Sequence, residues 1–353
     1  LSRGLGDVYK RQINPIITHS TKNGNIRKVK NDKIDSKGIA KLGLSKDIPV
    51  SQFPAKLVLE LRSLTRKYYD LTDERSAHIN KLKGDLHTVF PQYLDVFCDV
   101  TGKTSTMILR QYGTPDKILR GHKKTMIEKI SKASRKGLAK ASERYEKLCA
   151  AANAAKTFGC QIDSIYFNIF LTLDLVEKLD SALDSILNRI RQLITFNKNE
   201  KFIQQIKLLN TIPGVGFLTA VTIMCEIGDF SAFRNPKQLF AYFGLDPEVN
   251  ESGKFVGTQL HMSKRGSRIA RRAIFAVALA SIRTKRNGEG INPYLRKYYE
   301  LKSGQKPKMV AIGAVMHKVC NIVFAVLRDE KAFELRSPEE HCKQYQRPAL
   351  AAA

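Results

Sequence analysis

The chain has 353 residues, with 60 Lys and Arg against 33 Asp and Glu and a formal net charge of +27. This length allows two or three domains with a substantial core. Such a positive surplus predicts a polyanionic partner, nucleic acid first, because each neutralised phosphate releases bound counterions. The basic residues are spread over several segments, and no apolar run reaches the roughly 20 residues that span a bilayer, so a membrane partner is not expected.

The cysteines indicate a reducing compartment such as the cytosol. No Cys-x-x-Cys pair occurs, so neither a zinc site nor a disulfide framework is expected. No secretory signal is visible. The six cysteines are Cys98, Cys149, Cys160, Cys225, Cys320 and Cys342.

The first twelve residues show neither strand alternation nor helix periodicity. They are similar to the translated adapter sequence found at the ends of some assembled environmental reading frames. Residues 1–12 are therefore left out of the fold prediction as a non-native segment. On this interpretation the natural N-terminus is expected to be missing.

Residues 13–55 are short and basic, and a helix is predicted from near Asp32 to Gly43. Asp32 and Asp35 are three residues apart, which places them on one face of that helix. Two carboxylates on one face can share a divalent metal. The alternative is that they cap the helix or interact with its dipole, which is the commoner role of Asp at a helix start.

Residues 56–201 predict two long amphipathic helices around a set of shorter ones, with Pro91 ending the first. The pair is expected to form an antiparallel coiled-coil arm that pairs with a second subunit in a homo-oligomer. The apolar seams are Leu57, Leu61, Leu64, Tyr68, Leu71, Ile79, Leu82, Leu86 and Val89, then Ile162, Ile165, Ile169, Leu173, Val176, Leu179, Leu183, Ile186, Ile190 and Leu193.

Residues 202–334 predict a compact, mostly helical C-terminal domain, and residues 335–353 predict a disordered tail. Near the start of the domain, Ile212–Gly216 reads Ile-Pro-Gly-Val-Gly between apolar flanks, which is typical of a helix-hairpin-helix. Gly214 and Gly216 would let the turn approach a phosphate, toward which the amides of the following helix point. The alternative is an ordinary turn between two packed helices.

A second basic signal lies further along this domain. Six Lys and Arg and no acid occur between positions 254 and 272. They are predicted to bind a nucleic-acid backbone through charge and helix-terminal amides, the alternative being a solvated basic face. The six are Lys254, Lys264, Arg265, Arg268, Arg271 and Arg272.

Ser252 and Gly253 lie in a polar segment without helical period, expected to be a loop. A serine held out on a loop can act as a nucleophile, but a turn serine is the commoner reading of this dipeptide. His261 is the only nearby candidate for a base.

Together these segments resemble the DEDD transposases of insertion sequences, the IS110 family, which is related to the Piv invertase. Val29–Ser36 is similar to the family signature Lys-Thr-Asp-Lys-x-Asp-Ala, from which Asn31 and Ser36 depart. The resemblance runs from Ile13 to about Phe333, with blocks in the family's order. The remaining blocks are Ile212–Gly216, Phe233–Leu239, Tyr242–Pro247, Ser252–Gly253 and Ser263–Gly266.

The resemblance implies a RuvC-like (RNase H-like) metal domain and a serine nucleophile from the C-terminal domain, which form one composite site. By position, Asp32 and Asp35 would bind Mg²⁺, and Ser252 would be the nucleophile. Ser263 is the second choice, because the family motif admits Thr there. The implied activity is DNA recombination guided by a structured bridge RNA, so the expected partners are DNA and that RNA, in the nucleoid of a prokaryotic cytoplasm.

The family pattern begins with a strand carrying Gly-Ile-Asp, followed by further strands and a Glu, and nothing before Asn14 matches it. Residues 13–55 are therefore expected to be the C-terminal remnant of the RuvC-like α/β domain, and the covered part mainly α. The RuvC-like site of the family has four acids, and Asp32 and Asp35 match only the last two. Because the first two are unmatched, the chain is expected to be an inactive fragment. The alternative function is non-catalytic nucleic-acid binding through the hairpin and the basic helix.

Overall fold

The protein is mainly helical in the part that its structure describes, which confirms the predicted α class. The chain divides into two units, Leu1–Leu59 and Glu60–Ala353. In the first unit, helix α2 (Asp32–Leu44) has almost the bounds predicted for it. The assignment of residues 13–55 to a RuvC-like remnant falls mostly outside the described residues and stays a prediction. The computed structural model describes residues 32–44, 54–160, 162–248, 251–252, 255–256 and 261–340.

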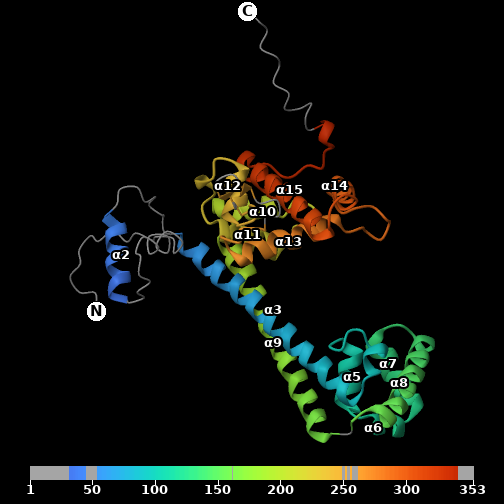
Figure 1. The fold of residues 1–353 in the computed structure, drawn as a ribbon. Coiled ribbons are helices and arrows are strands. Elements are labelled where there is room, and N and C mark those ends of the chain that lie inside the picture. Colours follow the sequence, from blue (N-terminus) through green and yellow to red (C-terminus); the bar gives the residue numbers. More distant parts are fainter. Residues whose placement is uncertain are drawn as a thin grey trace, which may run out of the picture. The chain divides into compact units, whose positions relative to one another are not determined.

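Two helices of 34 residues each, α3 (Lys56–Val89) and α9 (Asp163–Phe196), lie side by side in opposite directions (Figure 1). Arg75 of α3 forms an ion pair with Asp180 of α9, with Nη2 3.1 Å from Oδ2. Along both helices the buried residues recur at steps of three and four, as predicted for an amphipathic pair. Self-association through a coiled coil stays a prediction. The most buried positions are Val58, Leu61, Thr65, Leu71, Leu82, Leu86 and Val89 in α3, and Tyr166, Ile169, Leu173, Val176, Leu183 and Ile190 in α9.

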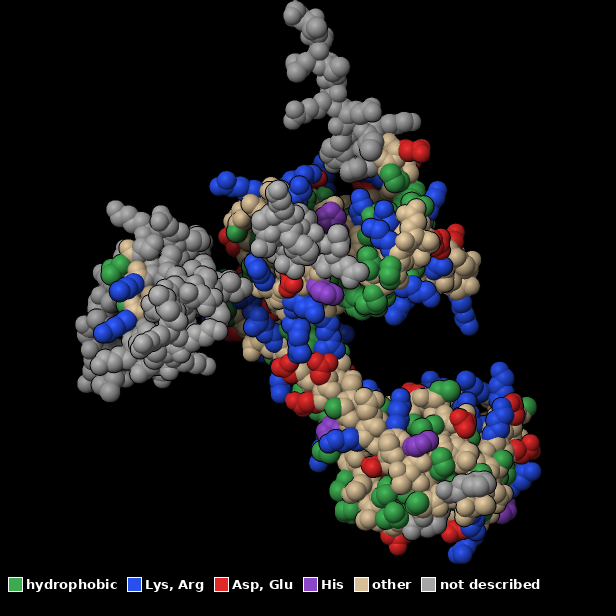
Figure 2. All heavy atoms as spheres, viewed as in Figure 1, with side chains coloured by type: hydrophobic (Ala, Val, Ile, Leu, Met, Phe, Trp, Pro, Cys, Tyr) green, Lys and Arg blue, Asp and Glu red, His purple; other side chains and the backbone are tan. Residues whose placement is uncertain are grey.

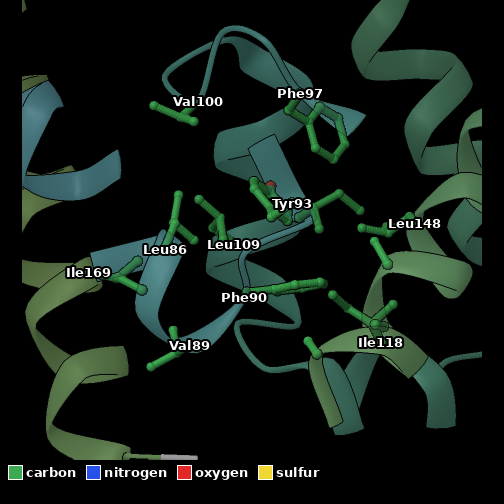
Figure 3. Packing of buried hydrophobic residues seen from close by; sticks show 14 of the residues in the cluster. Leu86, Val89, Phe90, Tyr93, Phe97, Val100, Leu109, Ile118, Leu148 and Ile169 are labelled. Carbon is green, nitrogen blue, oxygen red and sulfur yellow. The ribbon is translucent and has the colours of Figure 1, made fainter. Parts of the chain in front are cut away.

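Between α3 and α9 the chain forms a lobe of short helices with its own apolar core (Figure 3). Phe90 and Tyr93 are fully buried there, and the Tyr93 hydroxyl donates to the Ser105 carbonyl oxygen over 3.0 Å. Thr114 caps one of these helices ahead of Pro115, a pair that favours helix initiation. The helices are α4 (Tyr93–Val96), α5 (Lys103–Gln111), α6 (Pro115–Arg120), α7 (Lys123–Ser134) and α8 (Leu138–Phe158).

The C-terminal domain packs its helices around α15 (Lys308–Asp329), whose buried residues run along most of its length. Asn-Pro pairs begin two of the helices, at Asn235 and Asn292, where the Asn side chain accepts a backbone N–H. The other elements are α10 (Lys201–Leu209), α11 (Phe217–Ile227), η1 (Phe230–Ala232), α12 (Pro236–Tyr242), β1 (Glu251–Ser252), β2 (Phe255–Val256), α13 (Arg268–Ile282) and α14 (Pro293–Ser303).

Helix α15 is long and apolar enough to cross a membrane by length and composition alone. Here it is the central helix of the domain, in contact with α10, α12, α13 and α14. Val315, Val319 and Val323 are fully or almost fully buried among these neighbours. Packing inside the domain therefore accounts for the apolar character of α15.

Candidate catalytic and nucleic-acid-binding site

The two candidate metal ligands, Asp32 and Asp35, lie in the first turn of α2. Their side chains fall outside the described part of the chain. Carboxylate oxygens are suitable donors for Mg²⁺, but two of them fill only part of its octahedral shell. Among the residues whose side chains are described, no three His, Cys, Asp or Glu gather into a possible metal site. The assignment of Mg²⁺ to this pair stays a prediction.

The turn between α10 and α11 separates the roles of its two glycines. Gly214 has a φ of +96°, and a Cβ there would lie 2.6 Å from Ser281 Oγ of α13. The same Ser281 hydroxyl donates to the Pro213 carbonyl oxygen over 3.0 Å. Gly214 is therefore required for packing of the turn against α13. Gly216 is exposed at the start of α11, with nothing within 4 Å of an added Cβ, and its contact with a phosphate stays a prediction.

Two glycines let the segments 242–246 and 263–267 cross in close contact. A Cβ on Gly266 would lie 2.0 Å from the Tyr242 carbonyl oxygen. A Cβ on Gly244, whose φ is +66°, would lie 2.5 Å from the Gly266 nitrogen. Neither position accepts a larger residue without displacing the backbone of the other segment. The two sequence blocks are thus one structural unit, which we call the crossed loops.

The crossed loops form the base of a β-hairpin. Ser263 Oγ donates to Asp246 Oδ1 over 2.6 Å, and the Ser263 N–H donates to the Asp246 carbonyl oxygen over 2.8 Å. One step further along, the Glu248 N–H donates to the His261 carbonyl oxygen over 2.7 Å. Beyond this base, β1 pairs with β2 in antiparallel register, with Ser252 opposite Phe255.

Ser252, the first-choice nucleophile, therefore belongs to a short strand, whereas sequence analysis predicted an irregular loop. Its side chain and Lys254 fall outside the described residues. Ser263, the second choice, is half-buried at the hairpin base against a carboxylate. The structure thus connects the two candidate serines through one hairpin.

Three of the predicted cations are exposed on the crossed loops or directly after them. Lys264 and Arg265 lie on the loop that leads into α13, and Arg268 is the first residue of that helix. Arg268 is 75% exposed and lies 3.8 Å from the nearest carboxylate oxygen, of Asp73. These exposed side chains can contact a phosphate, Arg268 in exchange for its long ion pair with Asp73.

Arg271 and Arg272 are half-buried, and groups of the protein itself hold their guanidinium groups. The Arg271 guanidinium donates to the carbonyl oxygens of the crossed loops, at 2.7 Å to Gly266. Desolvation there lowers the pKa of Arg271. Arg272 pairs with Asp73 of α3 over 2.7 Å and lies over the Tyr69 ring, 4.8 Å from its centre. Both contacts are structural, so the nucleic-acid role predicted for these two arginines has less support than that of Arg268.

A buried carboxylate that sequence analysis did not single out joins α11 to α3. Glu226 has a side chain 2% exposed, and Arg66 of α3 contacts both of its oxygens, at 2.8 and 2.9 Å. Burial by itself raises the pKa of Glu226, but hydrogen bonds from Arg66 and Ser267 and the guanidinium charges of Arg66 and Arg62 outweigh it, so the pKa is lowered. One acid inside the apolar run of α11 was the available sequence signal, because a buried charge needs a partner.

Comparison with known proteins agrees with these features. A family profile described as "Transposase IS116/IS110/IS902 family" matches residues 206–300, which contain the turn between α10 and α11 and the crossed loops. A second profile, described as "Transposase" and specific for DEDD proteins of the IS110 type, matches residues 8–91. That match begins inside the segment 1–12 and continues along α3, past the boundary predicted at Lys56.

Three curated relatives are similar over long stretches. The uncharacterized 43.6 kDa protein of insertion element IS110 from Streptomyces coelicolor is 23% identical over 80% of this chain and 66% of its own. The pilin gene-inverting protein of Moraxella bovis is 30% identical over 50% of this chain and 52% of its own. The transposase for insertion sequence element IS1111A from Coxiella burnetii is 26% identical over 52% of this chain and 50% of its own.

These matches place the chain among the transposases of insertion sequences. It belongs to the IS110 family. The chain spans from half to two thirds of the length of the three relatives.

Proposed function

We propose that this chain is a DNA transposase or site-specific recombinase that cuts and rejoins DNA at the ends of an insertion sequence. Family membership supports the class of reaction. One observation carries the proposal: the hairpin holding Ser252 rises from the crossed loops, on or directly after which Lys264, Arg265 and Arg268 are exposed. A phosphodiester backbone held by these cations would lie next to the hairpin.

Ser252 is the proposed nucleophile. Its Oγ attacks a backbone phosphorus and forms a serine–phosphate ester, while the bond from phosphorus to one sugar oxygen breaks. The serine proton goes to solvent or a base, and the departing sugar oxygen takes up a proton. Attack by another sugar hydroxyl reverses these steps and releases the serine. Mg²⁺ bound at Asp32 and Asp35 would stabilise charge on the phosphoryl oxygens.

Ser263 is kept as the alternative nucleophile because of its contact with Asp246. A hydroxyl hydrogen-bonded to a carboxylate has the arrangement of a nucleophile with an adjacent base. In the hairpin geometry the same contact also closes the hairpin base, which is a structural role. The two roles are separable by experiment, as described below.

The proposed partners are DNA, a structured guide RNA and a second copy of the chain. The last is supported by α9, where exposed apolar side chains recur every four residues at Phe167, Leu171 and Leu175. Such a stripe is typical of an interface. The proposed location is the cytoplasm, in association with the nucleoid.

The test is to incubate the chain, and the chain extended upstream in its reading frame, with donor and target DNA, guide RNA and Mg²⁺. A covalent protein–DNA adduct is expected, which Ser252→Ala abolishes and Ser231→Ala, an exposed control, retains. Loss of the adduct in Ser263→Ala alone would move the nucleophile to Ser263. DNA binding without adduct or strand exchange in every form would support the alternative, a non-catalytic nucleic-acid-binding protein.

A further inference from the structure

The lobe between α3 and α9 carries a concentration of positive charge that the proposed catalytic site does not use. Between residues 90 and 162 the chain has fourteen Lys and Arg and six Asp and Glu. Figure 2 shows Lys and Arg side chains gathered over the part of this lobe formed by α7 and α8. The acids are Asp95, Asp99, Asp116, Glu128, Glu143 and Glu146.

The acids of the lobe neutralise little of this charge. Asp116 pairs with Lys156 over 2.6 Å, and Glu143 with Lys147 over 2.8 Å. In the described part of the chain, no acid pairs with Lys136 or Lys140. Like charges kept this close lower the stability of the folded state, so the cluster is a cost unless an anion offsets it.

A recess of about 310 Å³ lies where the end of α7 meets the start of α8. Four cations line it, Lys136, Lys140, Arg144 and Lys147, against two acids, Asp95 and Glu143, and Glu143 pairs with Lys147. The Arg144 guanidinium lies over the Phe97 ring, 5.6 Å from the ring centre, and this contact positions the side chain. The recess is thus a concave basic surface with one cation positioned in advance.

The start of α8 adds to this potential. Its N-cap is Gly137, which offers no side-chain cap, and its first turn contains no acid. Helix N-termini carry a partial positive charge that acids usually offset, whereas Lys140 adds a further positive charge there. The local sequence is therefore unfavourable for the helix itself and favourable for a bound anion.

We propose that the recess and the α7–α8 face around it bind the phosphodiester backbone of a nucleic-acid duplex, as a second site separate from the crossed loops. The charge is spread along two helices, which suits a polyanion with repeating phosphates. No base-reading role is assigned, because the side chains involved are lysines and arginines that contact phosphates through charge. The DNA and the structured RNA of the proposed function both present such a backbone.

Cys98 offers a local readout because it is exposed and lines the recess. Cys160 is exposed too but does not line it, so it serves as an internal control. The chain is alkylated with a bulky maleimide in the presence of a 24-base-pair DNA duplex, the matching RNA duplex or polyglutamate. Mass spectrometry then gives the alkylation rate at each cysteine.

We expect a duplex to slow alkylation of Cys98 several-fold and to leave Cys160 unchanged. The DNA and RNA arms show which duplex occupies the site. Equal rates at Cys98 with and without either duplex would overturn the proposal, and so would protection by polyglutamate alone, which would indicate an acidic protein as partner.

The matched variants are two charge-neutralised triples. One triple removes three cations from the lobe: Lys132→Gln, Lys136→Gln and Lys140→Gln. It should lower duplex affinity on the order of tenfold. It should also reduce the steepness of log K against log salt by about 2 to 3. The control is a triple at exposed lysines of α3 and α9, namely Lys81→Gln, Lys83→Gln and Lys178→Gln. Equal losses in both triples, or protection of Cys98 that survives in the lobe triple, would contradict the proposed site. Catalytic variants such as Ser252→Ala leave Cys98 protection intact, so failure of the proposed function is distinguishable.

Discussion

Asp246 and Ser263 form two hydrogen bonds with each other, one through the side chains at 2.6 Å and one through the backbone at 2.8 Å. They close the base of the hairpin on which Ser252 lies. The position of Ser252 therefore depends on a contact between residues six positions before it and eleven positions after it.

The first prediction concerns this closure. Asp246→Ala removes the acceptor for Ser263 Oγ, so the hairpin should open more often, and strand cleavage should fall by an order of magnitude or more. The free energy of unfolding should change by only about 1 kcal/mol, because one partly exposed hydrogen bond is lost. Limited proteolysis between residues 248 and 262 measures the opening.

Asp246→Asn is the conservative control, because its amide oxygen still accepts from Ser263. It should retain resistance to protease. If Asn kept the hairpin closed but abolished cleavage, the Asp246 carboxylate would be acting as a base, in favour of Ser263 as nucleophile.

The second prediction uses the pairing of Glu226 with Arg66. Arg66→Ala leaves a carboxylate buried without its main partner, and should destabilise the protein by about 2 to 3 kcal/mol near pH 7. Glu226→Gln should cost less, because Arg66 is half exposed and water can solvate it. Chemical denaturation of both variants measures the difference, and equal costs would contradict it.

The pH dependence of this pair has a definite sign. The pKa of Glu226 is lowered in the folded protein, so its contribution to stability is present above the unfolded pKa, near 4.5, and is lost as pH falls through the folded value. In Arg66→Ala, burial raises the pKa of Glu226 instead. The stability gap between wild type and Arg66→Ala should therefore widen as pH rises from about 4 to 7.

The third prediction tests the close approach of the crossed loops. Gly266→Ala places a Cβ 2.0 Å from the Tyr242 carbonyl oxygen, so the loops must separate, at a cost of about 2 kcal/mol or more. Gly313→Ala is the matched control, because Gly313 lies within α15 with nothing within 4 Å of the added carbon. That change should stabilise the protein by about 0.5 to 1 kcal/mol. Thermal unfolding distinguishes the two, and a stabilised Gly266→Ala would refute the close packing.

The fourth prediction separates structural from binding arginines. Arg271→Gln should lower the free energy of unfolding by about 1 to 2 kcal/mol, because the guanidinium bonds to the crossed loops are lost. Arg268→Gln should leave stability unchanged and lower DNA affinity, with a salt slope smaller by about 0.9. Denaturation and salt-dependent binding are measured on both. If Arg271→Gln unfolded with the same free energy as the wild type, Arg271 would again be a candidate for contacting DNA.

Sequence periodicity predicted the helices better than it predicted the roles of single residues. The helix from Asp32 and most of the α3 seam agree with the structure, because both depend on local spacing. Near the start of α3, Val58 and Thr65 are buried where Leu57 and Leu64 were predicted. Gly214 was expected to face a phosphate, yet it packs on Ser281, from a segment 67 residues later. The binding of Arg271 by the crossed loops, and the pairing of Glu226 with Arg66, likewise depend on tertiary neighbours that no local pattern contains. The family resemblance supplied the candidate roles of Ser252 and Asp32, which spacing alone could not.

The contact of Arg272 with Tyr69 and Asp73 couples the movement of α13 to that of α3. Helix α13 begins directly after the crossed loops, and this contact fastens it to α3, which continues for twenty residues beyond Tyr69. At 1.5 Å per residue that length is about 30 Å, so one degree of tilt about the contact displaces the far end by about 0.5 Å. We therefore expect a displacement of the distal end of α3 to be transmitted through Arg272 to the start of α13 and to the crossed loops that precede it.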